Sequence, residues 1–274
     1  MALLRRSRKE PFDQLMVDFS RQDVLIELTA AGRTLLAGLW GWQAAVAGQG
    51  LTVAGPWTEQ CWHTDADVDY LEICQPLLGG WKIERQMLLA RKDNFLFLAD
   101  AIIGPSAATA APLEIRYRTT LPIADGKTYL PAAETCEGLL MHGRKRSATV
   151  VPLALPEWRA ELAHSSFNVE GDSLCLSQAA QGRSLYAPLW LDLSSSRFRQ
   201  PLTWRKLTVA EDLAIVPRDV AVGFRVEAAP DQWLIYRSLA PRGNRTVLGK
   251  NFSSEFVCCR FYRNGETGDI LEIQ

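Results

Sequence analysis

Short apolar or alternating runs, separated by turn residues, recur along the whole chain. No long helical pattern intervenes between them, and this spacing predicts an all-β protein, namely a large two-sheet antiparallel β-sandwich. The expected strands are Val24–Thr29, Thr34–Trp42, Tyr70–Cys74, Trp81–Leu89, Phe95–Ile103, Leu113–Thr120, Phe167–Glu170, Ser173–Leu176, Tyr186–Leu193, Thr203–Val209, Val220–Glu227, Gln232–Leu239, Glu255–Tyr262 and Ile270–Ile273.

Three segments refine this picture. Residues 81–103 predict a β-hairpin whose second strand, Phe95–Ile103, is apolar enough to be buried on both faces. Pro156–Ala163 predicts the one short helix, because proline suits a first helical turn and good helix formers follow it. The same β pattern lies on both sides of residues 104–112. That stretch of small residues is therefore expected to be a surface crossover within a single domain, residues 1–274.

The composition of the chain disfavours some classes of binding partner. The 274 residues carry a formal net charge of −1, which disfavours a protein that binds nucleic acid through bulk attraction. No apolar window reaches the roughly 18 residues that span a bilayer, and the first residues are too polar for a signal-peptide core. The six cysteines show no CxxC spacing, so reduced thiols and a cytoplasmic location are expected. No membrane partner is predicted, and a homo-oligomer is left open.

Several catalytic motifs are absent. The sequence has no GxGxxG dinucleotide fingerprint, no GxSxG nucleophile elbow and no HExxH zinc motif. No cofactor is therefore expected.

The densest polar segment is Trp57–Asp69. His63, Asp65, Asp67 and Asp69 alternate, so on an extended chain they would share one face. His63 with Asp65 and Asp67 could perform acid–base chemistry on a sugar, and these three are the candidate catalytic residues. The run lacks the glycine and distal glutamate of a calcium loop, so no metal is predicted. The alternative is a solvated turn between strands, where aspartate is common.

Arg85 interrupts an apolar stripe within the first strand of the hairpin, and Asp100 is similarly out of place in the second. A buried arginine requires a carboxylate partner. The two are therefore predicted to form a structural ion pair, with a substrate-facing pair as the alternative.

Nine tryptophans suggest a binding surface, because flat rings stack on sugar faces. Most lie in apolar runs typical of a core, which leaves Trp57 and Trp62 beside the polar segment, and Trp204. Trp204 lies in a basic segment with Arg197 and Arg199. These five residues are the candidate ligand-binding residues. Charges that protect an edge strand from aggregation explain the basic segment equally well.

Residues 79–103 resemble the C-terminal β-sandwich of the heparinase II/III-like polysaccharide lyases. In that family a strand with an internal arginine is followed, after a short turn, by an apolar strand with an aspartate, and Arg85 and Asp100 match those positions. The family's metal region is matched loosely by His63 and Asp65. Its lyases carry an α/α-toroid before the sandwich, and only about 20 residues precede the first expected strands here. The resemblance thus implies the fold more than the activity.

Two functions follow as hypotheses. One is a non-catalytic module that binds or accompanies a polysaccharide or oligosaccharide. The other is a lyase or other sugar-active enzyme that uses His63 and the aspartate cluster. A structural or assembly module is the third alternative.

Overall fold

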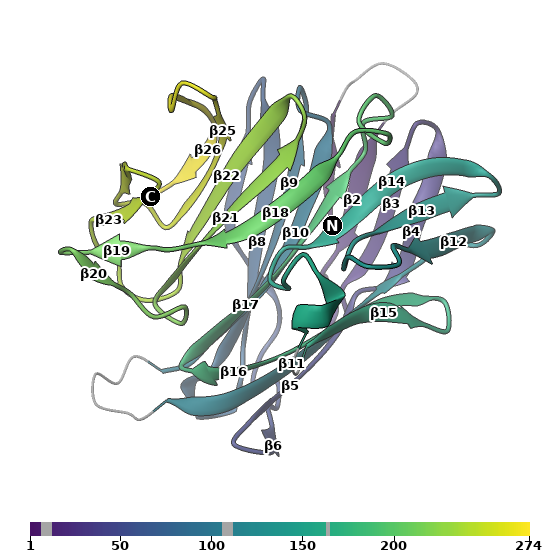
Figure 1. Ribbon diagram of the computed structural model, residues 1–274. Coiled ribbons are helices and arrows are strands. Elements are labelled where there is room, and N and C mark those ends of the chain that lie inside the picture. The colour runs from purple at the N-terminus through teal and green to yellow at the C-terminus, as the bar shows by residue number, and fades with distance from the viewer. Residues whose placement is uncertain (7–12, 106–111, 163–164) are drawn as a thin grey trace.

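The computed structural model describes residues 1–6, 13–105, 112–162 and 165–274. In these residues the strands form five antiparallel sheets, which confirms the predicted all-β sandwich (Figure 1). No helix among them is both long and apolar enough to cross a membrane. The stretch at residues 104–112 lies largely outside the described residues.

The central sheet contains the predicted hairpin. Its second strand, Phe95–Ile103, is buried on both faces, as its continuous apolar run predicts. Arg85 and Asp100 are direct cross-strand partners in this hairpin. In spatial order the strands are β12 (Lys127–Pro131), β13 (Gly138–His142), β14 (Lys145–Pro152), β17 (Ser184–Asp192), β10 (Phe95–Ile103), β9 (Lys82–Ala90), β8 (Val68–Pro76) and β7 (Thr58–Thr64).

One face of the central sheet is covered by two sheets from the first two thirds of the chain. Tyr117 of β11 reaches this face and donates a hydrogen bond to Asp100. Figure 1 shows β5, β11 and β16 side by side at the lower end of the molecule. The first of these sheets contains β1 (Ala2–Arg5), β2 (Gln14–Asp18), β3 (Leu25–Ala30) and β4 (Arg33–Leu39). The second contains β15 (Ser166–Glu170), β16 (Ser173–Gly182), β11 (Leu113–Pro122), β5 (Gly41–Val46) and β6 (Gln49–Gly50).

The opposite face is covered by the C-terminal part of the chain. Phe95 stacks on Trp190 within the central sheet and meets the edge of Trp233 from the covering sheet, so aromatic rings fill this interface. The covering sheet contains β18 (Leu202–Leu207), β21 (Ala221–Ala228), β22 (Asp231–Ser238), β25 (Phe256–Phe261) and β26 (Thr267–Ile273). A small adjoining sheet contains β20 (Ala214–Ile215), β19 (Ala210–Glu211), β23 (Arg245–Val247) and β24 (Lys250–Phe252).

The helix predicted at Pro156–Ala163 is much shorter than expected. Its described residues contain only a single 3-10 turn, η2 (Arg159–Glu161), of the same kind as η1 (Leu78–Gly80). Thr135 and Trp158 form an isolated antiparallel bridge, and the backbone N–H of Arg159 donates to the carbonyl of Glu134. Long-range pairing at Trp158 and Arg159 therefore limits the segment to this one turn and overrides its helix propensity.

Candidate functional site

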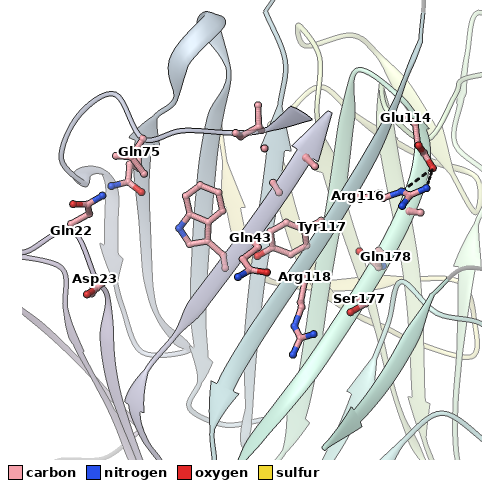
Figure 2. Close-up of a pocket in the computed structure, with 17 residues that line it drawn as sticks. Gln22, Asp23, Gln43, Gln75, Glu114, Arg116, Tyr117, Arg118, Ser177 and Gln178 are labelled. Atoms are coloured by element: carbon pink, nitrogen blue, oxygen red, sulfur yellow. Dashed lines mark hydrogen bonds and ion pairs between the residues drawn. The ribbon is translucent and has the colours of Figure 1, made fainter. Parts of the chain in front are cut away.

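A groove of about 970 Å³ runs along β5, β11 and β16. Figure 2 shows Gln22, Asp23 and Gln75 on one side of it and Arg116 and Arg118 on the other. The groove forms because β5 is nearly an edge strand: on its outer side it pairs with β6 only at Ala45 and Val46. Side chains from both faces of β5 can therefore reach the opening.

Strand alternation supplies the polar groups of this groove. On β11 the even-numbered Arg116 and Arg118 face outward, whereas Tyr117 between them is buried. The exposed Gln43 is the cross-strand partner of Arg118, and the partly exposed Trp42 also lines the groove. Arg116 is paired with Glu114 at 3.0 Å. The groove thus combines an indole ring, an amide and two guanidinium groups.

A second cavity of about 520 Å³ adjoins the groove and shares Gln22, Asp23, Trp42, Gln43 and Arg118 with it. The second cavity is further lined by Trp40, Trp57 and Arg85. The guanidinium carbon of Arg85 lies 3.8 Å from the ring centroid of Trp40 and 5.2 Å from that of Trp57, which are cation–π distances.

Arg85 and Asp100 form a two-pronged ion pair, with Nε to Oδ1 at 2.7 Å and Nη2 to Oδ2 at 3.0 Å. Both side chains are buried. The Tyr117 hydroxyl donates to the same carboxylate, and the Thr119 hydroxyl lies 3.4 Å from it. Burial and the Asp100 charge raise the pKa of Tyr117 well above its usual value, so it stays protonated as a donor. With its hydrogen bonds satisfied inside the protein, this pair has the geometry of the predicted structural ion pair, not of the substrate-facing alternative.

The predicted shared face of His63, Asp65, Asp67 and Asp69 is wrong. Strand β7 ends at Thr64 and β8 begins at Val68, so the intervening residues form a turn and the carboxylates diverge. The Asp65 carboxylate accepts hydrogen bonds from two backbone N–H groups of this turn, at 2.7 and 2.9 Å. These bonds, after the opposing effect of partial burial, lower its pKa.

The remaining members of this segment have separate partners. His63 Nε2 lies 3.2 Å from Asp65 Oδ2, and both side chains are exposed. Asp67 pairs with Lys92 and Arg260, both at 3.0 Å. The buried Asp69 accepts from Arg91 at 2.6 Å and from the backbone of Arg5. The carboxylates therefore brace a turn against neighbouring strands.

The five candidate ligand-binding residues do not come together. Trp204 is 2% exposed, so its ring has no free face for stacking on a sugar, and that prediction is corrected. Trp57 lines the second cavity but is only 5% exposed and lies beside the Arg85 guanidinium, so its ring is not open for stacking and that prediction is corrected as well. Their indole N–H groups donate to backbone carbonyls, of Leu155 and Gln22 respectively. Trp62, at 39% exposure, is the open ring among the three.

Arg197 also has a structural environment. It forms hydrogen bonds with both carboxylate oxygens of Asp192, at 2.8 and 2.9 Å, and donates to the carbonyl of Asp93 at 2.6 Å. Its side chain is only 9% exposed, which corrects the prediction of ligand contact. Arg199 remains exposed.

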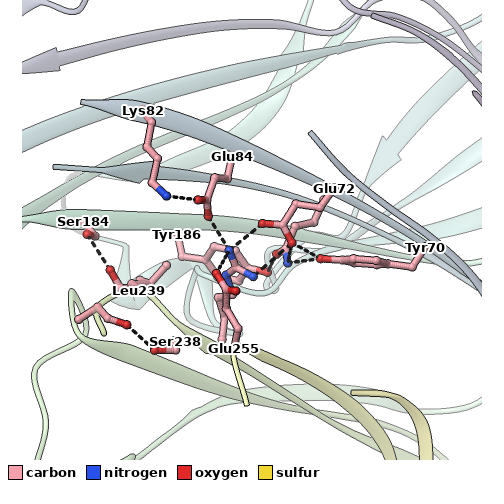
Figure 3. Close-up of polar contacts among 12 residues, drawn as sticks. Tyr70, Glu72, Lys82, Glu84, Ser184, Tyr186, Ser238, Leu239 and Glu255 are labelled. Atoms are coloured by element: carbon pink, nitrogen blue, oxygen red, sulfur yellow. Dashed lines mark hydrogen bonds and ion pairs between the residues drawn. The ribbon is translucent and has the colours of Figure 1, made fainter. Parts of the chain in front are cut away.

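A second buried polar cluster lies on the other face of the central sheet and was not predicted. Figure 3 shows Glu72, Glu84 and Glu255 converging on one another. Nη2 of Arg237 lies among them, at 2.8, 2.5 and 3.2 Å from their respective carboxylates. Burial opposes the charge of Arg237, but these carboxylates outweigh it and raise its pKa. The guanidinium thus occupies the position that a metal ion would take among three carboxylates.

No model of a known protein family matches this sequence, and no curated protein matches it either. Solved structures do resemble the fold. The heparan sulfate lyase HepC from Pedobacter heparinus matches 86% of this chain with a TM-score of 0.58 and 11% identity. The heparinase III described as the BT4657 gene product matches 86% with a TM-score of 0.56 and 9% identity.

This chain spans 41% of the length of each of those two proteins. At these identities the likeness shows the fold alone, which is the β-sandwich found in heparinase III structures. The resemblance of residues 79–103 to heparinase II/III-like sandwiches is therefore confirmed at the level of the fold.

The groove itself was missed from the sequence. Two signals were present: the regular alternation of Leu113–Thr120, which sets Arg116 and Arg118 on one face, and Gln43 inside an otherwise apolar run. The pairing of β5 with β11, which joins them, depends on contacts between distant segments.

Proposed function

We propose that this chain is a carbohydrate-binding β-sandwich module whose groove along β5, β11 and β16 holds a polysaccharide or oligosaccharide. The observation that carries the proposal is the groove's combination of the Trp42 ring, the Gln43 and Gln178 amides, and the Arg116 and Arg118 guanidinium groups. Aromatic rings stack on the apolar faces of sugars, and amides and guanidinium groups form hydrogen bonds with hydroxyls and carboxylates.

Arg118 is the group of the groove that favours an acidic sugar chain, since Arg116 is paired with Glu114 of the same lining. Arg118 is paired with the exposed Glu170, an arrangement that solvent weakens and that an anionic ligand could replace. The Pedobacter protein that shares this fold is a heparan sulfate lyase, so an acidic polysaccharide is the first class to test.

The lyase alternative has less support from the geometry. His63, Asp65 and Asp67 are not among the residues that line the groove. Asp65 and Asp67 are engaged by the turn and by Lys92 and Arg260. Incubation with uronic-acid polymers tests the lyase alternative, because a lyase releases unsaturated products that absorb ultraviolet light. We expect no such products. Product formation by the wild type that His63→Ala abolishes would contradict this expectation.

A glycan array followed by calorimetry tests the binding proposal. Wild-type protein is expected to bind acidic polysaccharide, and the double variant Gln43→Ala/Arg118→Gln to bind about tenfold more weakly or worse, because it loses two neighbouring polar groups from paired strands of the groove. Both side chains are at least partly exposed, so the double variant is expected to fold normally.

Arg225→Gln is the matched control. Arg225 is also a partly exposed strand arginine paired with a glutamate, but it lies on β21 and outside the groove. It is expected to bind as the wild type does. Equal binding by wild type and double variant, or no binding by the wild type to any acidic or neutral glycan, would overturn the proposal.

A further inference from the structure

A separate cavity of about 140 Å³ lies where β16 and β17 meet β18 and β21. Leu185, Val222 and Phe224 contribute apolar walls, and Lys206 and Arg218 contribute positive charge. At about 30 Å³ per water-sized group, this volume accommodates a ligand of roughly five such groups. The cavity shares Gln178 and Ala179 with the groove.

Lys206 occupies a position where the fold expects an apolar residue. On β18 it lies two residues from the buried Trp204 and therefore on the same face, and its cross-strand partner is the buried Phe224. Directly opposed residues of an antiparallel pair share a face, so the Lys206 side chain projects toward the interior. Burial, with a smaller contribution from Arg218, lowers the pKa of Lys206 to about 8.

The two cations of this cavity are not paired with the one carboxylate that also lines it. Among the residues that the structure describes, neither Lys206 nor Arg218 has a hydrogen-bond acceptor or an ion-pair partner. The carboxylate that also lines the cavity, Asp219, accepts a hydrogen bond from the backbone N–H of Arg183 at 2.8 Å. The site therefore carries excess positive charge beside apolar walls.

A second, independent observation is the amide of Gln178. This side chain is 8% exposed and lines the cavity, and its carbonyl oxygen has no hydrogen-bond donor in the described part of the chain. A buried acceptor without a donor lowers stability, so a ligand that brings a donor gains binding free energy there.

We propose that this cavity is a binding site for a small hydroxycarboxylate. Its carboxylate pairs with Lys206 and Arg218, a hydroxyl donates to Gln178 Oε1, and its carbon atoms contact Leu185 and Phe224. The cavity lies between other strands than the polysaccharide groove, although Gln178 and Ala179 line both, and the proposal does not depend on that function.

Calorimetry with glycerate, glycerol and propionate tests each part. Glycerate is expected to bind the wild type, glycerol to bind undetectably because it has no charge, and propionate to bind more weakly because it has no hydroxyl. Lys206→Met is expected to weaken glycerate binding by about tenfold or more. Arg205→Met, the neighbouring exposed position on the same strand, is the matched control and is expected to bind normally.

A second measurement uses the folded wild type, so the proposal can still be tested if the Lys206→Met variant does not fold. In protein with ¹³C-methylated lysines, saturating glycerate is expected to raise the pKa of the Lys206 resonance, assigned by its loss in Lys206→Arg. The proposal is overturned by any of three results: no saturable glycerate binding, equal binding of glycerol, or a folded Lys206→Met variant with unchanged affinity. An unchanged Lys206 resonance at saturation would overturn it as well.

Discussion

Arg85 and Arg237 are buried against opposite faces of the central sheet, and their surroundings differ in charge. Arg85 meets one carboxylate, Asp100, in a two-pronged pair, and aromatic rings flank its guanidinium. Arg237 meets the carboxylates of Glu72, Glu84 and Glu255. The first cluster is balanced by a single pair. The second gathers three carboxylates around one guanidinium, with Lys82 at its margin.

This difference in surrounding charge determines how much each arginine contributes to the stability of the folded protein. Removing Arg85 leaves one carboxylate that still accepts from the Tyr117 hydroxyl. Removing Arg237 leaves carboxylates within 4.8 Å of one another in a largely buried site, where like charges repel strongly. A buried pair can be replaced as a unit, whereas a shared cation cannot be removed without changing all its partners.

The largest effect is expected for Arg237→Met. It is expected to lower the free energy of unfolding by about 3–5 kcal/mol at neutral pH, because buried carboxylates lose their principal cation. Urea denaturation measures the change. The loss is expected to shrink at acidic pH, where the carboxylates become protonated. A loss that is the same at both pH values would contradict the charge argument.

Arg85→Met is expected to cost less, about 3 kcal/mol, because Asp100 keeps the hydroxyl donor of Tyr117. The double variant Arg85→Met/Asp100→Leu is expected to regain most of this loss, since no unpaired charge remains buried. A double-mutant cycle from urea denaturation measures the coupling. If the double variant were as unstable as the sum of its single variants, the pair would not act as a unit.

The same comparison explains what the sequence could predict. Arg85 and Asp100 interrupt two apolar runs joined by a short turn, and a hairpin pairs positions that are equidistant from its turn. Their proximity follows from local pattern alone. Arg237 lies 165 residues from Glu72 and 153 from Glu84 along the chain, on a different sheet, so no local signal joins them.

The candidate site follows the same rule. The strands were predictable from alternation, but the groove arises from the pairing of β5 with β11 and from residues near Gln22. The basic neighbours of Trp204 suggest a ligand site, but its alternation with Arg205 already places the two side chains on opposite faces of a strand. The predicted shared face of His63 and the aspartates is wrong for another reason. Alternating residues share a face only while the chain stays extended, and the chain turns at Asp65.

A smaller effect, with a definite sign, is expected at Glu255. Burial, opposed by Arg237 and reinforced by Glu72 and Glu84, raises the pKa of this carboxyl in the folded protein. Between the unfolded and folded pKa values the folded state holds the extra proton, so this group's contribution to stability falls as pH rises. The free energy of unfolding of the wild type minus that of Glu255→Gln is therefore expected to decrease from about pH 4 to about pH 7.

Urea denaturation of both proteins across this range measures the difference, and taking the difference removes the titrations that they share. Arg225→Gln, run in parallel, leaves the Arg237 cluster intact and is expected to show a pH profile parallel to that of the wild type. If the free energy of unfolding of the wild type minus that of Glu255→Gln increased with pH, the attraction of Arg237 would exceed the effect of burial.

The smallest effect is expected where the same two chemical groups meet at the surface. Arg225 and Glu227 pair at 2.6 Å, as closely as the buried pairs, but their side chains are 35% and 32% exposed. Solvent screens the pair and competes for both groups, so Arg225→Gln is expected to lower the free energy of unfolding by less than about 1 kcal/mol. Urea denaturation alongside Arg85→Met compares the two directly. If both substitutions cost the same, distance and not burial would govern the strength of these pairs, and the contrast between Arg85 and Arg237 would need another cause.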